Sequence, residues 1–373
     1  MSALRGLPAA LARQPWHVIV PLTLLVCFGA SVLYSAAGGH WMPWAALHIV
    51  RFLVFLVMAM VIAQVPREFV RFMALPVYLV TVLLLMAVEA MGFVGGGSQR
   101  WLNLGFMTLQ PSELMKPGIV IILARFYDML PPGATREFRS LLVPGALIGV
   151  PVGLVLIQPD LGTSLAIVFG AVVVMFLAGL PLAWFVSAGV AGLVALPVLF
   201  FFALHDYQRQ RVWTFLDPES DPLGSGYHIT QSKIAIGSGG LFGKGFGHGT
   251  QSHLNYLPEP HTDFVFATMA EEWGMLGGLF VLFVFGVLLR WGLRVARDAP
   301  DRFSRLMAAG LTATIFFYAA VNLLMVMGFA PVVGIPLPFM SHGGSSMMTI
   351  MICVGLIMAV DRWGRRDPRG GIE

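Results

Sequence analysis

The chain has 373 residues, of which 57% are hydrophobic and only 11% are charged. Soluble domains carry roughly 25% charged residues, so this composition excludes a water-soluble globular protein and indicates a chain whose main solvent is lipid. The net charge of +4 could suit a nucleic-acid partner, but the positions of the basic residues argue against one.

Ten segments are apolar and long enough to be membrane-spanning helices, each of which needs roughly 20 residues. They lie at about 17–37, 45–65, 73–93, 111–130, 141–158, 162–179, 181–204, 265–289, 305–328 and 343–361. The first is longer than the apolar part of a signal peptide, so we expect it to stay in the protein. The sequence therefore predicts an all-α, polytopic membrane fold. It is a single transmembrane domain over residues 1–373, with a large extracytoplasmic loop, 205–264, between the seventh and eighth helices.

The basic residues predict the orientation of this fold. With a cytoplasmic N-terminus and alternating helices, the cytoplasmic segments hold 16 of the 23 Lys and Arg residues. These are Arg5, Arg13, Arg67, Arg71, Arg125, Arg136, Arg139, Arg290, Arg294, Arg297, Arg302, Arg305, Arg362, Arg365, Arg366 and Arg369. The short outer loops hold Arg100 alone, as the positive-inside rule expects. Both termini are therefore predicted to be cytoplasmic, and the basic charge is explained by topology, so no nucleic-acid partner is expected.

The outer loop between the third and fourth predicted helices ends in QPSELMK, residues 110–116. Pro111 suits a first helical turn, and Glu113 favours the positive end of a helix. Glu113 and Lys116 are three residues apart, so they share one helix face. An ionisable group at membrane depth costs about 2.5–3.5 kcal/mol on insertion scales. The pair therefore either lines a polar cavity or locks two helices together, and the sequence leaves both interpretations open.

Two other outer turns carry candidate residues. Asp160 lies in the QPDLG turn at 158–162, where an Asp commonly bonds its own backbone and becomes a site candidate only as part of a larger polar set. In the last outer loop, Gly328 to Ser346, three prolines forbid a continuous helix, and irregular backbone at membrane depth must be buried or line a watery cavity. Ser345 and Ser346 open the last helix there, where backbone N–H groups suit an anionic ligand.

The long polar stretch from His205 carries four cations, Arg209, Arg211, Lys233 and Lys244, around a Gly-rich run. The run lacks the spacing of a nucleotide-binding P-loop, so no nucleotide is expected. Backbone N–H groups of a Gly-rich turn and these cations could instead hold a pyrophosphate. The alternative is a solvated flexible loop.

Metal-binding spacing is absent from the sequence. Five of the nine histidines lie in the long stretch, at 205, 228, 248, 253 and 261, but no pair has the HExxH spacing of a zinc helix. Which residues would hold a metal is unknown from the sequence. We expect a divalent cation, Mg²⁺ or Mn²⁺, that is held by carboxylates and substrate phosphates rather than a zinc site made by the histidines. No haem is expected.

The stretch ends in YLPEPHTDFVFATMAEEWG, where Asp263 stands just before an apolar helix. An Asp in this place is commonly a helix N-cap. A partly desolvated Asp also has a raised pKa and can act as a general base toward a sugar hydroxyl. Spacing alone does not separate these two roles. Glu259 and His261 lie in the same run, while Glu271 and Glu272 lie inside the helix and are expected to be structural or metal-holding.

Six runs, in order along the chain, resemble the SEDS family of shape, elongation, division and sporulation proteins, most closely its rod-shape-determining branch. They are QRWLNLG, QPSELMK, QPDLGTS, the run from HDYQRQRV to GGLFGKG, LPEPHTDFVFATMAEEWG and GIPLPFMSHGGSS, which together span residues 99 to 346. The resemblance implies a peptidoglycan glycosyltransferase of the bacterial cytoplasmic membrane. Such an enzyme polymerises lipid-linked disaccharide–peptide units (lipid II) on the outer side, together with a class B penicillin-binding protein.

The resemblance also assigns roles to residues of this chain. The essential acid of the family falls on Asp263, the polar pair on Glu113 and Lys116, and the QPD acid on Asp160. We expect the remaining candidates to contact the substrate: Arg100, Arg209, Arg211, Lys233, Lys244, Glu259, His261, Ser345 and Ser346. His342 is assigned no role.

Two other functions compete with polymerisation. A transporter that flips the lipid-linked precursor should show symmetry-related broken helices around a midplane site, and the sequence shows no such internal symmetry. A non-catalytic scaffold for a penicillin-binding protein would not need ionisable residues in several separate outer loops. The pattern therefore favours the polymerase.

Overall fold

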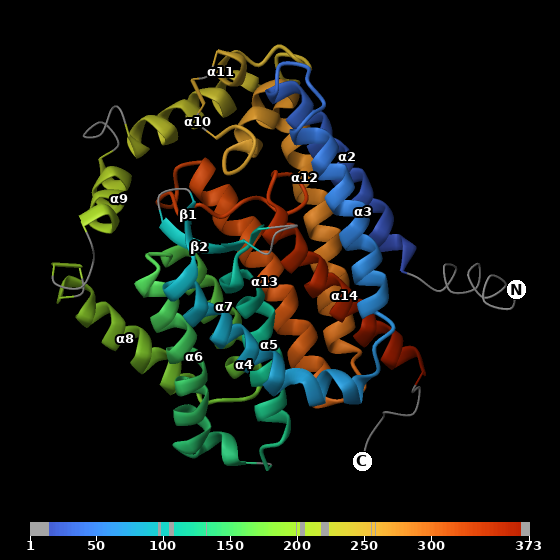
Figure 1. Cartoon of the computed structure of the whole chain (residues 1–373), viewed down its shortest axis with the longest axis vertical. Coiled ribbons are helices and arrows are strands. Elements are labelled where there is room, and N and C mark those ends of the chain that lie inside the picture. The colour runs from blue at the N-terminus through green and yellow to red at the C-terminus, as the bar shows by residue number, and fades with distance from the viewer. Residues whose placement is uncertain are drawn as a thin grey trace, which may run out of the picture.

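A computed structural model gives the fold of the chain and describes residues 15–95, 98–103, 108–131, 133–198, 200–201, 206–217, 224–254, 256–257 and 259–366. Long helices run side by side from one end of the molecule to the other (Figure 1). Their bounds are α2 (Trp16–Ala36), α3 (Trp44–Ile62), α4 (Arg67–Met91), α5 (Pro111–Asp128), α6 (Arg139–Ile157), α7 (Leu161–Leu177), α8 (Leu182–Val198), α12 (Val265–Arg297), α13 (Arg302–Val326) and α14 (Gly344–Arg366).

Each of the ten predicted spans overlaps one of these helices, which confirms a helical membrane fold. Seven helices are long and apolar enough to cross a membrane: α2, α3, α4, α6, α12, α13 and α14. The helices α7 and α8 are apolar but shorter. Helix α5 has 18 residues and carries four charged side chains, Glu113, Lys116, Arg125 and Asp128.

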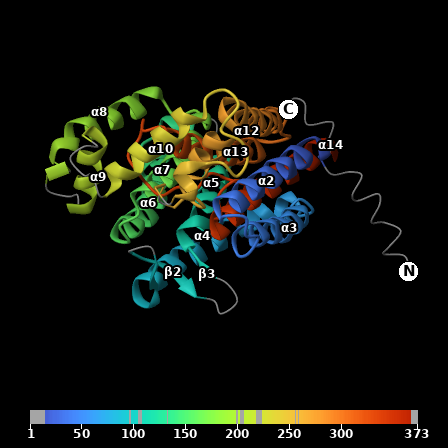
Figure 2. The same ribbon diagram turned by 90° about the horizontal axis from the view of Figure 1, so that it is seen from above.

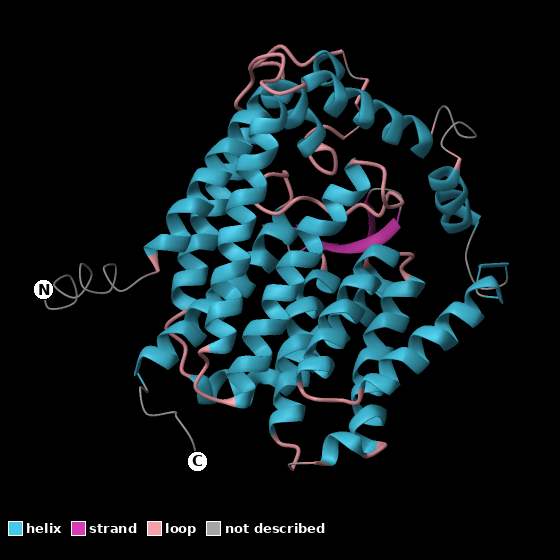
Figure 3. Cartoon of the chain, turned by 180° about the vertical axis from the view of Figure 1, so that it is seen from behind, coloured by secondary structure: helices cyan, strands magenta, loops and turns pink. Residues whose placement is uncertain are grey.

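The outer segments hold structure that the sequence analysis missed. A small antiparallel sheet of β1 (Phe93–Gly95), β2 (Ser98–Asn103) and β3 (Thr108–Leu109) lies between α4 and α5, and it projects from the bundle in Figure 2. The stretch 205–264 is largely helical where it is described, with α9 (Asp206–Leu216), α10 (Ser225–Gly239) and α11 (Thr250–His253). Figure 3 shows helices and loops of this stretch over one end of the bundle.

Small residues let the central helices approach closely. Helix α13 packs against α5, α7, α12 and α14. A Cβ on Gly310 of α13 would lie 2.6 Å from Val174 and 2.7 Å from Val120. A Cβ on Gly292 of α12 would lie 2.3 Å from the Thr312 hydroxyl. Lipid supplies no hydrophobic drive between helices, so close packing of this kind holds them together.

Helix α12 is broken at Gly274, which has φ +62° and ψ −156°. A break leaves backbone groups without helical partners, and the loop 240–245 supplies partners on both sides. The N–H groups of Lys244 and Gly245 donate to the carbonyls of Glu271 and Glu272, at 2.9 and 3.1 Å. The N–H groups of Met275 and Leu276 donate to Gly240 and Leu241, at 2.9 and 3.3 Å. The break is therefore a built feature of the fold.

Candidate active site

Asp263 lies at the end of a tight turn that leads into α12. The turn begins at Glu259, which has φ +46°, and the Glu259 carbonyl accepts from the N–H groups of Thr262 and Phe264, at 3.1 and 3.4 Å. Phe264, one residue after Asp263, is the N-cap residue of α12, so Asp263 does not take the N-cap position, which was one of the two roles that the sequence left open. The half-buried Asp263 carboxylate faces Gly334, where a Cβ would lie 3.6 Å from Oδ2.

Asn322 on α13 ties the Asp263 turn to the last outer loop. Its side-chain Nδ2 donates to the carbonyl of Asp263 at 3.0 Å and to the carbonyl of Ile335 at 2.7 Å. Asn322 is fully buried. The amide therefore fixes both segments around the Asp263 carboxylate.

Two further hydrogen bonds join the two segments, and a third lies within the loop that faces Asp263. The Ser341 hydroxyl donates to the carbonyl of Thr262 at 2.6 Å and accepts from the N–H of Leu337 at 2.8 Å. The N–H of His342 donates to the carbonyl of His261 at 2.8 Å. The segment that precedes Asp263 and the loop that faces it thus form one hydrogen-bonded unit.

A histidine pair borders this unit. The His261 ring stacks on Trp44, with centroids 4.3 Å apart. His342 Nδ1 lies 3.1 Å from the Trp44 carbonyl, and Nε2 lies 2.8 Å from Arg51 Nη1. Arginine can only donate, so Nε2 accepts and Nδ1 carries the proton of a neutral ring. Burial and the nearby Arg51 lower the pKa of His342 to about 4, and burial also lowers the pKa of His261 although Glu259 opposes it.

Glu113 and Lys116 form a closed buried cluster with Tyr318 of α13. Lys116 Nζ lies 2.7 Å from Glu113 Oε1 and 2.6 Å from the Tyr318 hydroxyl, which also donates to Glu113 Oε2. Lys116 is 1% exposed and Glu113 is 5% exposed. These contacts join α5 to α13, as the helix-locking interpretation expects, and a cavity-lining role stays a prediction. Tyr318 and Asn322 are four residues apart, so one face of α13 connects this cluster to Asp263.

Asp160 caps α7, because its Oδ1 accepts from the N–H of Thr163 at 3.0 Å. Its Oδ2 accepts from Gln110 Nε2 at 3.1 Å and lies 3.6 Å from Arg100 Nη1. Arg100 also donates to the carbonyls of Gln158 and Pro159. These residues hold the strand segment, the start of α5 and the start of α7 together.

The predicted cations come from α9, from α10 and from the loop after α10. Lys244 Nζ binds Glu271 Oε1 at 2.6 Å and the Thr250 hydroxyl at 2.9 Å. The exposed Lys233 of α10 lies over Gly328, where a Cβ would be 2.2 Å from its Cε. Arg209 and Arg211 belong to α9, and the side chain of Arg211 lies outside the described residues. Of the four, Lys244 is thus engaged with Glu271, and a role for the others at a pyrophosphate stays a prediction.

The serines at the start of α14 are buried. The Ser345 hydroxyl lies 3.5 Å from the Thr108 carbonyl, and the Ser346 hydroxyl donates to the Gly343 carbonyl at 3.2 Å. The guanidinium of Arg51 is close by, because a Cβ on Gly344 would lie 3.6 Å from its Cζ. Arg51 was missed in the sequence, although an arginine inside an apolar span is itself a signal of function or pairing.

The described side chains also bear on where a metal ion could be held. Among the described residues, no group of three or more His, Cys, Asp or Glu side chains could hold a metal ion. Glu271, expected to be structural or metal-holding, makes structural contacts: it accepts from Lys244, from the Thr250 hydroxyl and from the N–H groups of Thr250 and Gln251. The described side chains therefore do not form a protein-held metal site.

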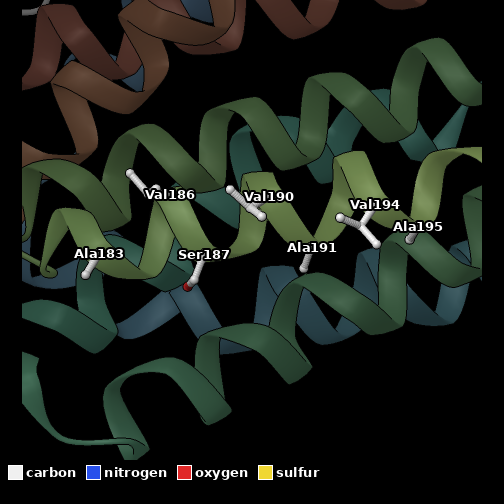
Figure 4. Close-up of a pocket in the computed structure, with 7 residues that line it drawn as sticks. All are labelled: Ala183, Val186, Ser187, Val190, Ala191, Val194 and Ala195. Atoms are coloured by element: carbon white, nitrogen blue, oxygen red, sulfur yellow. The ribbon is translucent and has the colours of Figure 1, made fainter.

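An apolar groove of about 790 Å³ runs along α8. Figure 4 shows its lining side chains, all from this one helix: Ala183, Val186, Ser187, Val190, Ala191, Val194 and Ala195. Ring contact between Phe176 and Phe185, with centroids 5.8 Å apart, joins the end of α7 to the start of α8. The groove is separate from the polar residues around Asp263 and suits a hydrocarbon chain.

Comparison with known proteins gives consistent matches over nearly the whole chain. The family model FTSW_RODA_SPOVE, described as a cell cycle protein, matches residues 10–366. The chain is 45% identical over 351 residues to the peptidoglycan glycosyltransferase MrdB of Escherichia coli K12, covering 93% of each. It is 40% identical over 284 residues to stage V sporulation protein E of Bacillus subtilis, covering 76% of each.

Solved structures agree. A chain in a structure of polymerization and crosslinking by a peptidoglycan synthase complex matches with a TM-score of 0.82 and 32% identity, covering 95% of this chain and 99% of that one. The rod shape determining protein RodA of Thermus thermophilus matches with a TM-score of 0.71 and 30% identity, covering 94% and 97%.

Proposed function

Because this chain belongs to the family of FtsW, RodA and SpoVE cell cycle proteins, the SEDS family, and is a peptidoglycan glycosyltransferase, we propose that Asp263 is its general base. The substrates are lipid-linked disaccharide–peptide units, which the enzyme joins into glycan strands during cell elongation. The observation that carries this proposal is the placement of the Asp263 carboxylate against Gly334, between two hydrogen-bonded loops.

We propose the following reaction at this carboxylate. Asp263 takes the proton of the acceptor sugar's 4-hydroxyl as that oxygen attacks the anomeric carbon of the lipid-linked growing chain. The new glycosidic bond forms with inversion while the bond from that carbon to the pyrophosphate oxygen breaks. Polyprenyl pyrophosphate leaves with the bonding electrons, and donors near the outer surface, including Arg209, Arg211 and Lys233, offset its charge. The apolar groove along α8 is suited to the polyprenyl chain.

The test is Asp263→Asn, which keeps size and polarity but cannot accept the proton. Purified protein with its partner is incubated with lipid-linked precursor, and the glycan product is sized. Base catalysis contributes about 10²–10⁴-fold, so we expect a loss of that order with unchanged expression and partner binding. Glu137→Gln, which changes an exposed carboxylate outside the candidate site in the same way, is the matched control. An Asn variant as active as the wild type would remove Asp263 from the mechanism. A transport assay in sealed vesicles tests the flippase alternative.

A divalent cation, Mg²⁺ or Mn²⁺, is proposed to arrive with the substrate's pyrophosphate and to offset its charge. It is not proposed to sit in a site made by the protein, because the described side chains do not gather metal ligands. The same assay with and without a chelator examines this dependence.

The proposed topology is ten spans in the bacterial cytoplasmic membrane, with both termini cytoplasmic, the loop 205–264 between the seventh and eighth spans, and Asp263 facing outward. The proposed partner is a class B penicillin-binding protein in an elongation complex. A similar chain in a peptidoglycan synthase complex that coordinates polymerization with crosslinking supports this partner.

A further inference from the structure

A second cavity, which is partly polar and has a volume of about 330 Å³, lies at the end of α12 that is far from Asp263. The start of α2 and the ends of α12 and α14 form its walls. Its polar lining residues are His17, Trp291, Arg294, Asp298, Asp361 and Arg365. No role in polymerisation has been given to this cavity, and its position on the arginine-rich side separates it from the candidate active site.

The lining side chains come from single faces of their helices. Trp291, Arg294 and Asp298 are spaced three and four residues apart on α12, so they follow one face. Asp361 and Arg365 are four residues apart on α14. Val295 and Val360 add apolar surface to the same cavity. The cavity is thus amphipathic, as a site at a membrane interface must be.

Most of the charge in the cavity is paired. Arg365 binds Asp361 at 2.6 Å, and Arg297 binds Asp298 at 2.9 Å. Arg294, in contrast, has no ion-pair partner within 4.0 Å among the described residues. The cavity therefore presents one cation whose charge is not offset by a direct partner.

Trp291 provides a second, independent observation. The residue is 4% exposed, and its indole Nε1 is buried without a hydrogen-bond acceptor in the part of the chain that the structure describes. Buried donors almost always have a partner, so an unpartnered one calls for a missing acceptor. A group that accepts from both Trp291 and Arg294 is an anion with several oxygens.

We propose that this cavity binds the phosphate group of a phospholipid headgroup. Phosphate supplies oxygens for the Arg294 guanidinium and the Trp291 N–H, and arginine favours such multidentate anions. The apolar walls and the place of the cavity at three helix ends favour a phosphate that carries acyl chains. Trp16, 46% exposed beside His17, extends the same interface toward lipid.

The test uses delipidated protein in detergent, which is titrated with dioctanoyl phosphatidylglycerol. The unfolding temperature and the mass of lipid bound to the protein are measured at each concentration. Dioctanoylglycerol, which lacks the phosphate, and inorganic phosphate, which lacks the chains, are the parallel probes. Arg294→Gln removes the charge at an exposed position, and Trp291→Phe removes the N–H while keeping an aromatic ring. Arg290→Gln, which removes an exposed arginine one turn earlier on α12, is the matched control.

We expect saturable binding of the phospholipid, weakened roughly tenfold by Arg294→Gln, the scale of one charge-assisted hydrogen bond. Trp291→Phe should weaken it as well, and Arg290→Gln should leave it unchanged. Equal loss in Arg290→Gln and Arg294→Gln, or equal binding of dioctanoylglycerol, would overturn the site. Inorganic phosphate with the same affinity and the same Arg294 dependence would overturn the assignment to a lipid.

Discussion

At the scale of single residues, Asn322 is the contact on which the position of Asp263 depends. It donates to two carbonyls, one from Asp263 and one from the loop that faces it. Asn322→Leu keeps the number and branching of the side-chain heavy atoms and removes both donors. A buried polar group without a partner costs about 1–3 kcal/mol, so we expect lower thermal stability.

The Asn322→Leu variant should also lose kcat with little change in KM, because the base is displaced and the headgroup contacts remain. Thr314→Val is the matched control. Thr314 lies on the same helix, and its hydroxyl donates within that helix, to the Gly310 carbonyl at 3.0 Å. Full kcat in Asn322→Leu would show that the amide does not position the base.

His342 makes stability depend on pH in a predictable direction. Its pKa is about 4 in the folded protein and 6.5 in the unfolded chain, because burial and Arg51 disfavour the charged ring. Above pH 6.5 neither state is protonated. Between pH 6.5 and 4 this histidine binds a proton in the unfolded chain but not in the folded protein. The free energy of unfolding therefore falls as pH falls.

The measurement is the unfolding temperature from pH 8 to 4 in wild type and in His342→Gln. Glutamine can still donate to the Trp44 carbonyl and accept from Arg51, but it does not titrate. We expect a shallower decline in the variant, with a remaining part from His261, whose pKa is also lowered. His248→Gln, at an exposed position, is the control. Identical slopes in all three proteins would contradict the assignment.

At the scale of elements, the broken helix α12 depends on glycines in the loop that fills its break. Gly243 has φ +77°, and a Cβ there would lie 2.0 Å from the Glu272 carbonyl oxygen. Gly247 has φ +76°, but a Cβ there meets nothing within 4 Å. Both positions have a positive φ, which strains an ordinary residue, but only Gly247 has room for a Cβ.

Gly247→Ala should therefore cost roughly 1–2 kcal/mol, the price of a left-handed conformation for an ordinary residue. Gly243→Ala adds a clash with fixed backbone, typically another 1–3 kcal/mol. Thermal unfolding in detergent compares the two, and activity reports whether the first part of α12 still holds Asp263. Equal destabilisation of the two variants would mean that the loop shifts at no cost to make room for a Cβ at position 243.

Composition predicted the long helices well, because each span is a continuous apolar run with its own local signal. The α12 break at Gly274 carries no such signal, since the loop 240–245 that supplies its hydrogen-bond partners is more than twenty residues away in the sequence. Asn322 and Tyr318 were missed for the same reason: a single polar residue in an apolar helix shows no period. The short strands and α9 to α11 were missed because they are short segments without the long apolar run that marks a span.

At the scale of the whole molecule, the arginine-rich segments meet at one end. Arg67 pairs with Asp301 at 2.9 Å, Arg71 pairs with Asp128, and Arg302 donates to the Ala178 carbonyl at 2.9 Å. These contacts join the turns after α3, α5, α7 and α12. The 16 basic residues predicted to be cytoplasmic come from these turns and the termini.

Helices α5, α7 and α8 fall outside the long apolar set, and contacts place both ends of α5 and of α7. Helix α5 starts beside Asp160 through Gln110 and ends at Asp128. Helix α7 starts at the cap formed by Asp160 and ends next to Ala178. Helix α8 starts just after that end and leads toward α9 and α10. Helices α5 and α7 therefore run between the two ends of the bundle.

The orientation can be tested with single cysteines at positions 220 and 300, after Cys27 and Cys353 have been replaced by serine. Position 300 lies between α12 and α13 in the arginine-rich end, and position 220 lies in the stretch between α9 and α10. Positive charge is retained on the cytoplasmic side during insertion. We therefore expect a membrane-impermeant thiol reagent to label position 220 in intact spheroplasts, and position 300 only after lysis. Labelling of position 300 in intact cells would reverse the topology and would place Asp263 on the cytoplasmic side, away from the growing cell wall.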